Sequence, residues 1–318
     1  MAQSATARGA YLAEVSANER LCDEHYRMVL ATGGFPPSRP GQFVQLLCRP
    51  PAAEPTTRQV EWPPTGTPVF TQKELTEARP LLRRPLSLAG RRDGADGATD
   101  IEIIYRTVGT GTHWLATVGC GAVLSVLGPL GRGFGLDPAR PRAALVGGGV
   151  GLPPMLYLAG TLVQAGKTVT AFAGARSAAL LPLRPGRRPA GTDGKPAPCV
   201  AEFDRAGAEA VVATDDGSLG VAGLVSEPFV RWLDQQDNPA EQVKVYTCGP
   251  EPMMQAVAEA CTRRGVPCEV SMERHMACGM GTCQSCICTL RTDAEGGRQY
   301  KLCCTDGPVF DAEEIVWD

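Results

Sequence analysis

The chain has 318 residues, 43% of them hydrophobic, with a formal net charge of −3. This length suits about two domains plus a small module. No basic patch indicates nucleic acid, and no apolar run reaches the roughly 18 residues that a membrane span needs. The first fifteen residues lack the apolar core of a signal peptide. We therefore expect a cytoplasmic protein whose thirteen cysteines stay reduced.

The first predicted domain, residues 8–140, alternates short strands with Gly/Pro turns. The one clear helical piece is around Thr112–Val118, and several strands alternate apolar with polar residues, which favours a small antiparallel β-barrel over a βαβ unit. The expected strands are Ala10–Val15, Tyr26–Ala31, Gln42–Cys48, Leu86–Ala89, Ile101–Tyr105 and Ala122–Leu127.

Two short motifs in this domain carry chemistry. Arg84-Pro85-Leu86-Ser87 offers a guanidinium that could hold a pyrophosphate and a hydroxyl that could approach a flavin edge. Gly109-Thr110-Gly111-Thr112 adds backbone N–H groups suited to phosphate. The simpler readings are a solvated arginine and a glycine turn with Thr112 as the helix N-cap.

The second predicted domain, residues 141–270, alternates strands and helices. Ala143–Val146 runs into a glycine-rich turn, then the helix Met155–Ala165 and the strand Thr168–Ala173, which is suited to a dinucleotide pyrophosphate. The third glycine of the usual fingerprint is replaced by Leu152. A second unit joins the strand Val243–Thr247 to the helix Glu251–Arg264. The expected cofactor-binding residues are Gly147, Gly148, Gly149, Gly151, Gly249 and Pro250. Cys248, at the carboxyl end of a parallel strand, is either a candidate catalytic residue that faces the ligand crevice or a small buried residue.

The last predicted module, residues 271–318, contains cysteines in the spacing C-x4-C-x2-C followed by a distant cysteine. This is the plant-type arrangement for a 2Fe-2S cluster. The three close cysteines are Cys278, Cys283 and Cys286, and the fourth is Cys303 or Cys304. A structural zinc site would favour two close pairs of ligands, and a disulfide framework suits much shorter chains.

The order of these motifs resembles the ferredoxin–NADP reductase superfamily. Thr214–Gly220, Met276–Cys286 and Tyr300–Phe310 narrow the resemblance to the electron-transfer subunit of type 1B dihydroorotate dehydrogenase. The resemblance implies a multi-domain β plus α/β fold: an antiparallel FAD-binding barrel, a Rossmann-like parallel-sheet domain and a small iron–sulfur module. Two stretches, about 49–80 and 184–198, lie outside it and are interpreted as insertions.

The resemblance also implies site residues and partners. Cys304 precedes x-D-G-P and is therefore the expected fourth cluster ligand, although Cys303 lies beside it. The partner implied is an FMN-containing catalytic subunit that binds dihydroorotate, in a heterotetramer with two copies of each subunit. The implied FAD-contacting residues are Arg84, Pro85, Leu86, Ser87, Ile104, Tyr105, Arg106, Gly111 and Thr112.

The expected function is electron transfer from dihydroorotate through the partner's FMN, a 2Fe-2S cluster and FAD to NAD⁺, in pyrimidine biosynthesis. A flavin is needed because NAD takes two electrons at once, whereas the cluster passes one at a time. The alternatives are a related reductase subunit of a hydrogenase or transhydrogenase-type complex, and a non-enzymatic redox sensor. NAD is implied by the resemblance, although Arg176 could meet a 2′-phosphate.

Overall fold

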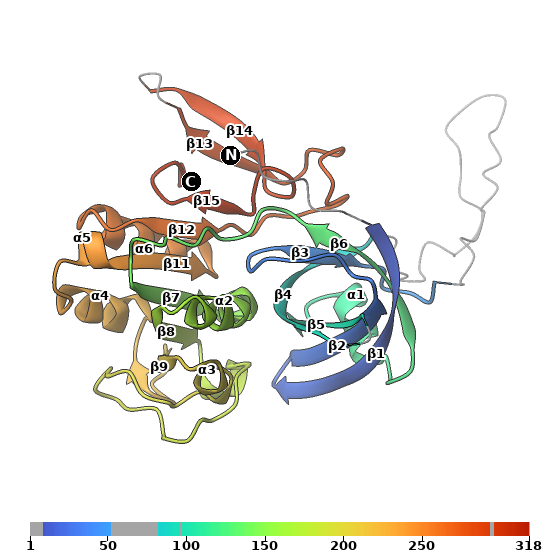
Figure 1. Ribbon diagram of the computed structural model, residues 1–318, viewed down its shortest axis with the longest axis horizontal. Helices are drawn as coiled ribbons and strands as arrows, with labels where there is room; N and C mark the ends of the chain where they lie inside the picture. The colour runs from blue at the N-terminus through green and yellow to red at the C-terminus, as the bar shows by residue number, and fades with distance from the viewer. Residues whose placement is uncertain (1–8, 52–81, 96, 293–295, 318) are drawn as a thin grey trace, which may run out of the picture.

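The computed structural model describes residues 9–51, 82–95, 97–292 and 296–317. A barrel and a sheet flanked by helices lie side by side, and the C-terminal segment runs along one edge of both (Figure 1). The stretch 49–80 that was interpreted as an insertion falls almost wholly outside the described residues. None of the helices in the described ranges combines the length and apolar character of a bilayer-crossing helix.

The barrel is closed by six antiparallel strands in the order β1-β2-β5-β4-β3-β6. All six predicted strands are confirmed, with shifted ends. Their bounds are β1 (Gly9–Cys22), β2 (His25–Gly33), β3 (Phe43–Leu46), β4 (Arg84–Asp93), β5 (Ala98–Arg106) and β6 (Val123–Leu130). Alternating apolar side chains such as Leu30, Ile101 and Val126 fill the interior and are fully buried.

Helix α1 (Thr110–Ala116) crosses one end of the barrel two residues earlier than predicted. Its N-cap is Gly109, so the alternative of Thr112 as the cap is wrong. Thr112 is instead the third helical residue, and its Oγ1 accepts hydrogen bonds from the backbone N–H groups of Val108 and Gly109 at 2.9 and 3.2 Å. The hydroxyl satisfies amides that the first turn leaves free.

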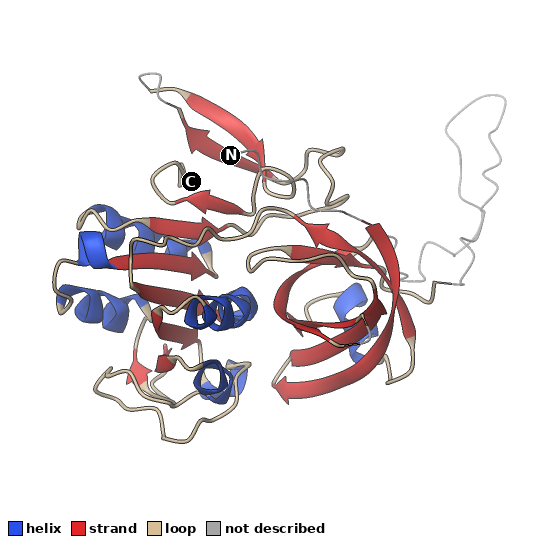
Figure 2. Ribbon diagram, in the orientation of Figure 1, coloured by secondary structure: helices blue, strands red, loops and turns tan. Residues whose placement is uncertain are grey.

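The second sheet has seven strands in the order β10-β9-β8-β7-β11-β12-β15. All neighbours are parallel except β15, which runs antiparallel to β12. Because helices cover both faces (Figure 2), β7, β8 and β11 are buried along nearly their whole length. The strand bounds are β7 (Arg142–Gly148), β8 (Thr168–Ala175), β9 (Glu209–Thr214), β10 (Val221–Ala222), β11 (Val243–Cys248), β12 (Cys268–Ser271) and β15 (Val309–Asp311).

The helices of this domain pack on opposite faces of the sheet. One hydrophobic cluster joins α2 and α3 to the sheet, and another joins α4 and α6 to its other face. The two predicted helices that follow glycine turns are confirmed as α2 and α6. The helix bounds are α2 (Leu152–Gln164), α3 (Ala201–Ala206), α4 (Ser226–Asp234), α5 (Pro239–Gln242) and α6 (Glu251–Thr262), with 3-10 turns η2 (Gly149–Gly151) and η3 (Ala178–Leu180).

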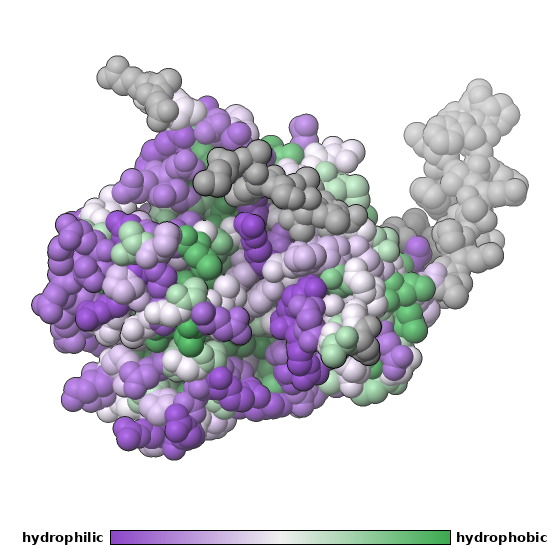
Figure 3. Space-filling model, in the orientation of Figure 1, coloured by the Kyte–Doolittle hydropathy of each residue, from purple (hydrophilic) through white to green (hydrophobic). Residues whose placement is uncertain are grey.

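On the face in Figure 3, hydrophilic residues cover most of this domain, with smaller hydrophobic patches among them.

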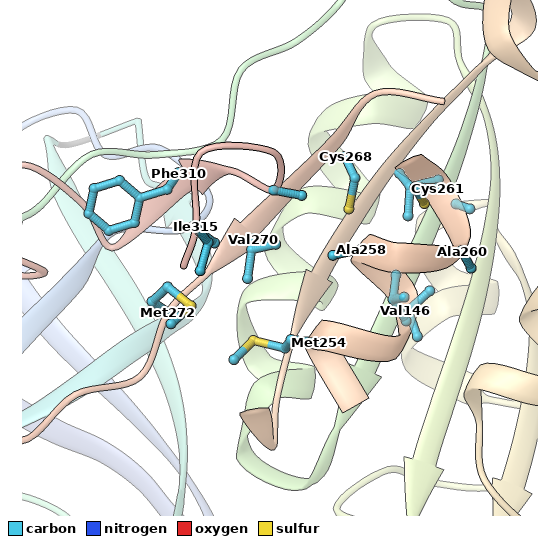
Figure 4. Close-up of a cluster of buried hydrophobic side chains, with 14 of the residues drawn as sticks. Val146, Met254, Ala258, Ala260, Cys261, Cys268, Val270, Met272, Phe310 and Ile315 are labelled. Carbon is cyan, nitrogen blue, oxygen red and sulfur yellow. The ribbon is translucent and has the colours of Figure 1, made fainter. Parts of the chain in front are cut away.

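The C-terminal segment contributes a hairpin of β13 (Ile287–Arg291) and β14 (Arg298–Leu302) before it reaches β15. Because β15 is the edge strand of the second sheet, the sheet extends across the boundary expected near residue 271. Figure 4 shows Phe310 and Ile315 of this segment beside Val270 and Met272, the latter just after β12. The stretch 184–198 is a loop tied back to the domain, with Ala197 paired to Ala210 and Arg187 bonded to Asp204.

Replacing Phe172 with alanine is expected to destabilise the parallel-sheet domain by about 3–5 kcal/mol, because it opens a cavity in the core. The Phe172 ring is fully buried and packs edge to face against Phe229 and Trp232. The distances between ring centroids are 5.5 and 5.6 Å. The measurement is urea unfolding followed by far-ultraviolet circular dichroism. The control Tyr300→Ala removes an aromatic ring that is 73% exposed and should change stability by less than ~0.5 kcal/mol.

Candidate functional site

A cavity of about 390 Å³ lies at the carboxyl ends of the parallel strands, where ligands bind in sheets of this kind. Gly148 and Gly149 line it after β7, and Gly249 and Pro250 line it after β11. Two charged side chains, Arg176 after β8 and Asp215 after β9, share the same wall. The barrel closes the opposite side with His25 and Arg106. The cavity therefore lies between the two domains.

The remaining glycines of the first turn serve close packing. A Cβ at Gly151 would lie 2.1 Å from the carbonyl oxygen of Cys248, and one at Gly147 would lie 2.9 Å from Leu152 Cδ2. The first contact is between two backbones, so it cannot be relieved by a side-chain rotation. Of the four glycines singled out in this turn, two line the cavity and two bring α2 against the strand ends.

Cys248 is the last residue of β11 and is 7% exposed. Burial raises the pKa of its thiol to about 12. Gly249 and Pro250, but not Cys248, are among the residues that line the cavity. The side chain is therefore a neutral thiol at physiological pH and has no thiolate character for nucleophilic chemistry.

The barrel brings the two predicted flavin motifs together. A Cβ at Gly111 would lie 3.0 Å from Arg84 Nε, so the arginine side chain packs directly against the glycine turn. Arg84 Nη1 donates to the carbonyl of Leu82 at 2.8 Å. Pro85, Leu86 and Ser87 follow on β4 and are only half-buried. The Arg84 side chain and the Gly111 turn are therefore neighbours, and Ser87 lies three residues further along β4.

The three residues of the other implied flavin segment have different surroundings. Ile104 and Tyr105 are buried, and the Tyr105 hydroxyl donates to Asn18 Oδ1 at 3.0 Å. The Tyr105 ring stacks on Tyr26, and burial raises its pKa. Arg106 pairs with Glu24 and lines the cavity between the domains.

The cysteine loop before β13 is shaped around sulfur. Cys278 Sγ accepts hydrogen bonds from the backbone N–H groups of Met280 and Cys283, both at 3.4 Å. Gly279 and Gly281 have φ values of 71° and 90°, a region that favours glycine. Cys286 Sγ accepts from the N–H of Cys304 at 3.4 Å. Backbone donors aimed at thiolates are typical of iron–sulfur sites.

The four expected ligands form two pairs of neighbouring thiols, Cys278 with Cys283 and Cys286 with Cys304. In the described part of the chain, no three His, Cys, Asp or Glu side chains converge as ligands of a single metal ion do. Two pairs fit a two-iron group, which takes two thiolates at each iron. The Ser285 hydroxyl at 3.2 Å is the main cause that lowers the pKa of Cys283 to about 6.

The two adjacent cysteines of the distant pair differ in surroundings. Cys303 is fully buried, donates to the carbonyl of Met272 at 3.2 Å and lies beside Cys288. Burial raises the pKa of Cys304 to about 12, yet its thiol faces Cys286. No disulfide joins any of the thirteen cysteines, all of which lie in the described part of the chain.

Comparison with known proteins identifies the family. The family model for the iron–sulfur cluster binding domain of dihydroorotate dehydrogenase B matches residues 273–316. The electron-transfer subunit of dihydroorotate dehydrogenase B (NAD⁺) from Bacillus caldolyticus is 40% identical over 77% of this chain and 84% of its own length. The corresponding subunit from Caldanaerobacter subterraneus is 32% identical over 96% of this chain and 98% of its own length. The chain belongs to this family of electron-transfer subunits.

Solved structures show the same fold at lower identity. An NADH-dependent reduced ferredoxin–NADP oxidoreductase aligns with a TM-score of 0.69 and 24% identity over 96% of this chain and 90% of its own. The FAD/NAD-binding domain of nitric oxide dioxygenase from Vibrio cholerae aligns with a TM-score of 0.55 and 20% identity over 82% of this chain and 98% of its own. Both comparisons confirm the ferredoxin-reductase architecture, and the predicted fold class is confirmed with it.

Sequence reasoning did not single out three side chains that the structure places at these sites. His25 is 2% exposed and lines the cavity. Asp215 was noted only within a family motif. Gln45 is fully buried in β3 and touches the cysteine loop at Gly279. A glutamine inside the apolar run Phe43–Leu46 was the available signal, because an uncharged polar side chain is seldom buried without a partner.

Replacing Gly279 with alanine is expected to remove most of the bound iron and the visible cluster absorbance. The left-handed backbone costs roughly 1–2 kcal/mol for any other residue, and a Cβ there would lie 2.1 Å from Gln45 Nε2. Gly296→Ala is the matched control, since its φ is also positive at 69° but no atom of the described residues lies within 4 Å of the added carbon. Equal iron content in both variants would contradict the assignment of this contact.

Proposed function

We propose that this chain passes electrons from the dihydroorotate-oxidising catalytic subunit to NAD⁺ through a 2Fe-2S cluster and FAD. Membership of the family supports this function, because the related subunits are named for electron transfer in an NAD⁺-dependent dihydroorotate dehydrogenase. The observation that carries the proposal is that the barrel contacts both the cavity and the cysteine loop. The barrel lines the cavity through Arg106 and touches the cysteine loop through Gln45.

Each proposed site has residues suited to its group. Arg84, the Gly111 and Thr112 turn and the hydroxyl of Ser87 would hold and orient FAD. The thiolates of Cys278, Cys283, Cys286 and Cys304 would hold the cluster. When bound, FAD supplies two-electron exchange with NAD⁺ and the cluster supplies one-electron exchange. The chain itself holds and positions these groups.

The nucleotide is proposed to lie in the cavity with its pyrophosphate at the Gly148 and Gly149 turn, at the N-terminus of α2. Gly249 and Pro250 would flank the nicotinamide, with the neutral thiol of Cys248 behind them. Arg176 and Asp215 follow adjacent strands, where the adenosine ribose is expected. A carboxylate at Asp215 can accept a hydrogen bond from a ribose hydroxyl and would repel a 2′-phosphate, which favours NAD over NADP.

The partner is proposed to carry FMN and to assemble with this chain as a heterotetramer, two copies of each subunit, in the cytoplasm. The test is anaerobic NADH formation from dihydroorotate and NAD⁺, using the matching catalytic subunit with and without this chain. We expect NADH only when both are present. If NADH reduces the bound flavin but no NADH forms from dihydroorotate, the reductase activity of this chain would stand. The proposed catalytic partner would then be excluded.

Cys304→Ser is expected to abolish the cluster signal in electron paramagnetic resonance, whereas Cys303→Ser should keep it. The thiol of Cys304 hydrogen-bonds to that of Cys286, whereas the thiol of Cys303 donates to the main chain in the core. The measurement compares iron content and the signal of the dithionite-reduced proteins. A Cys303→Ser protein that loses the signal while remaining folded would reverse the ligand assignment.

Asp215→Asn is expected to narrow the preference for NADH over NADPH in flavin reduction by about 10-fold, equivalent to about 1.4 kcal/mol. The neutral amide no longer repels a 2′-phosphate, and Arg176 remains on the same wall to attract it. Asp216→Asn is the matched control because Asp216 bonds to Ser218 and does not line the cavity. An unchanged preference in Asp215→Asn would refute this role.

A further inference from the structure

Gln45 occupies an unusual position for a polar residue. All four residues of β3 are buried, and the Gln45 side chain is 0% exposed. Its main chain pairs with Pro85 of β4, in the proposed flavin segment, and its carbonyl accepts from Arg83 Nη1 at 3.2 Å. The strand therefore holds Gln45 at the wall of the flavin-binding barrel.

The side chain of Gln45 leaves the barrel and packs on the cysteine loop. A Cβ at Gly279 would lie 2.1 Å from Gln45 Nε2 and 2.8 Å from its Cδ. Gly279 directly follows Cys278, the first proposed ligand. The carboxamide is thus a contact between the flavin barrel and the loop that would hold the cluster.

Neither Nε2 nor Oε1 of Gln45 has a hydrogen-bond partner among the described residues. A buried amide without partners is costly and is rarely kept unless a ligand completes it. Gln42, three residues earlier and also buried, shows the contrast. Its Nε2 donates to Gly131 O and its Oε1 accepts from Arg39 N, both at 2.8 Å.

We propose that Gln45 is a positioning residue for the iron–sulfur group, with its carboxamide donating a hydrogen bond to the sulfur assembly at Cys278. This inference rests on the proposed function. Thiolate and sulfide sulfurs are negatively charged acceptors, and the N–H groups of Met280 and Cys283 already donate to Cys278 Sγ. Gln45 adds a side-chain donor that comes from the flavin barrel.

Through this hydrogen bond from Gln45, the barrel contributes to the reduction potential of the cluster. Reduction adds a negative charge to the cluster, so a donor stabilises the reduced form more than the oxidised form and raises the potential. The same residue fixes the distance between the loop and the flavin segment, because its main chain belongs to the strand beside Pro85.

The test uses the full chain with FAD and cluster bound, in a redox titration followed by electron paramagnetic resonance. Gln45→Leu keeps the size of the side chain and removes the donor. We expect a lower cluster midpoint potential, with iron content and flavin potential unchanged. Gln42→Leu, the matched control, should lower the unfolding temperature and leave the cluster potential at the wild-type value.

An unchanged cluster potential in a fully loaded Gln45→Leu protein would overturn the inference, as would a shift in the flavin potential alone. If Gln45→Leu does not retain a cluster, Gln45→Glu gives the answer after reconstitution. Its carboxylate places a negative charge beside the sulfurs and should lower the potential, so an equal or higher value overturns the inference. A wild-type chain without any cluster would instead refute the proposed function.

Discussion

The arrangement of the three proposed redox sites depends on one short segment, residues 307–311. Its strand β15 pairs with β12 at the edge of the parallel sheet. Immediately before it, Gly307 O accepts from the N–H of Arg132 at 2.6 Å, and Pro308 O accepts from Met272 N at 2.9 Å. The segment thus touches both the sheet and the connection that leaves the barrel, and it begins three residues after Cys304. The cysteine module is held against both other domains by main-chain hydrogen bonds.

The barrel contacts the parallel-sheet domain at the cavity and the cysteine loop at Gln45. The cavity between barrel and sheet combines glycine turns with residues of β2 and β5, so the site needs both domains in contact. On the other side of the barrel, Gln45 meets Gly279. Electrons tunnel efficiently only over short distances, and a chain with three redox groups must therefore keep its domains in fixed contact. The close approach of the Gln45 side chain to Gly279 serves that requirement.

Buried polar side chains at the cavity differ from those in the barrel core in whether all of their polar atoms have hydrogen-bond partners. His25 Nδ1 lies 2.8 Å from the carbonyl of Asp23, whereas its Nε2 has no partner among the described residues and the ring borders the cavity. Burial is the main cause that lowers the pKa of His25, so the ring is neutral near pH 7. By contrast, the buried Tyr105 hydroxyl donates to the half-buried Asn18, so it is satisfied within the barrel.

The sequence alone determined the domain order, the six barrel strands and the cysteine spacing, because strand periodicity, glycine turns and ligand spacing are local properties of the chain. It also favoured Cys304 over Cys303, through family resemblance. Only the tertiary structure decided that β15 joins the parallel sheet, that Arg106 faces the cavity and that Gln45 reaches Gly279. These contacts join residues far apart in the chain, and their geometry depends on how whole domains pack, which no local pattern encodes.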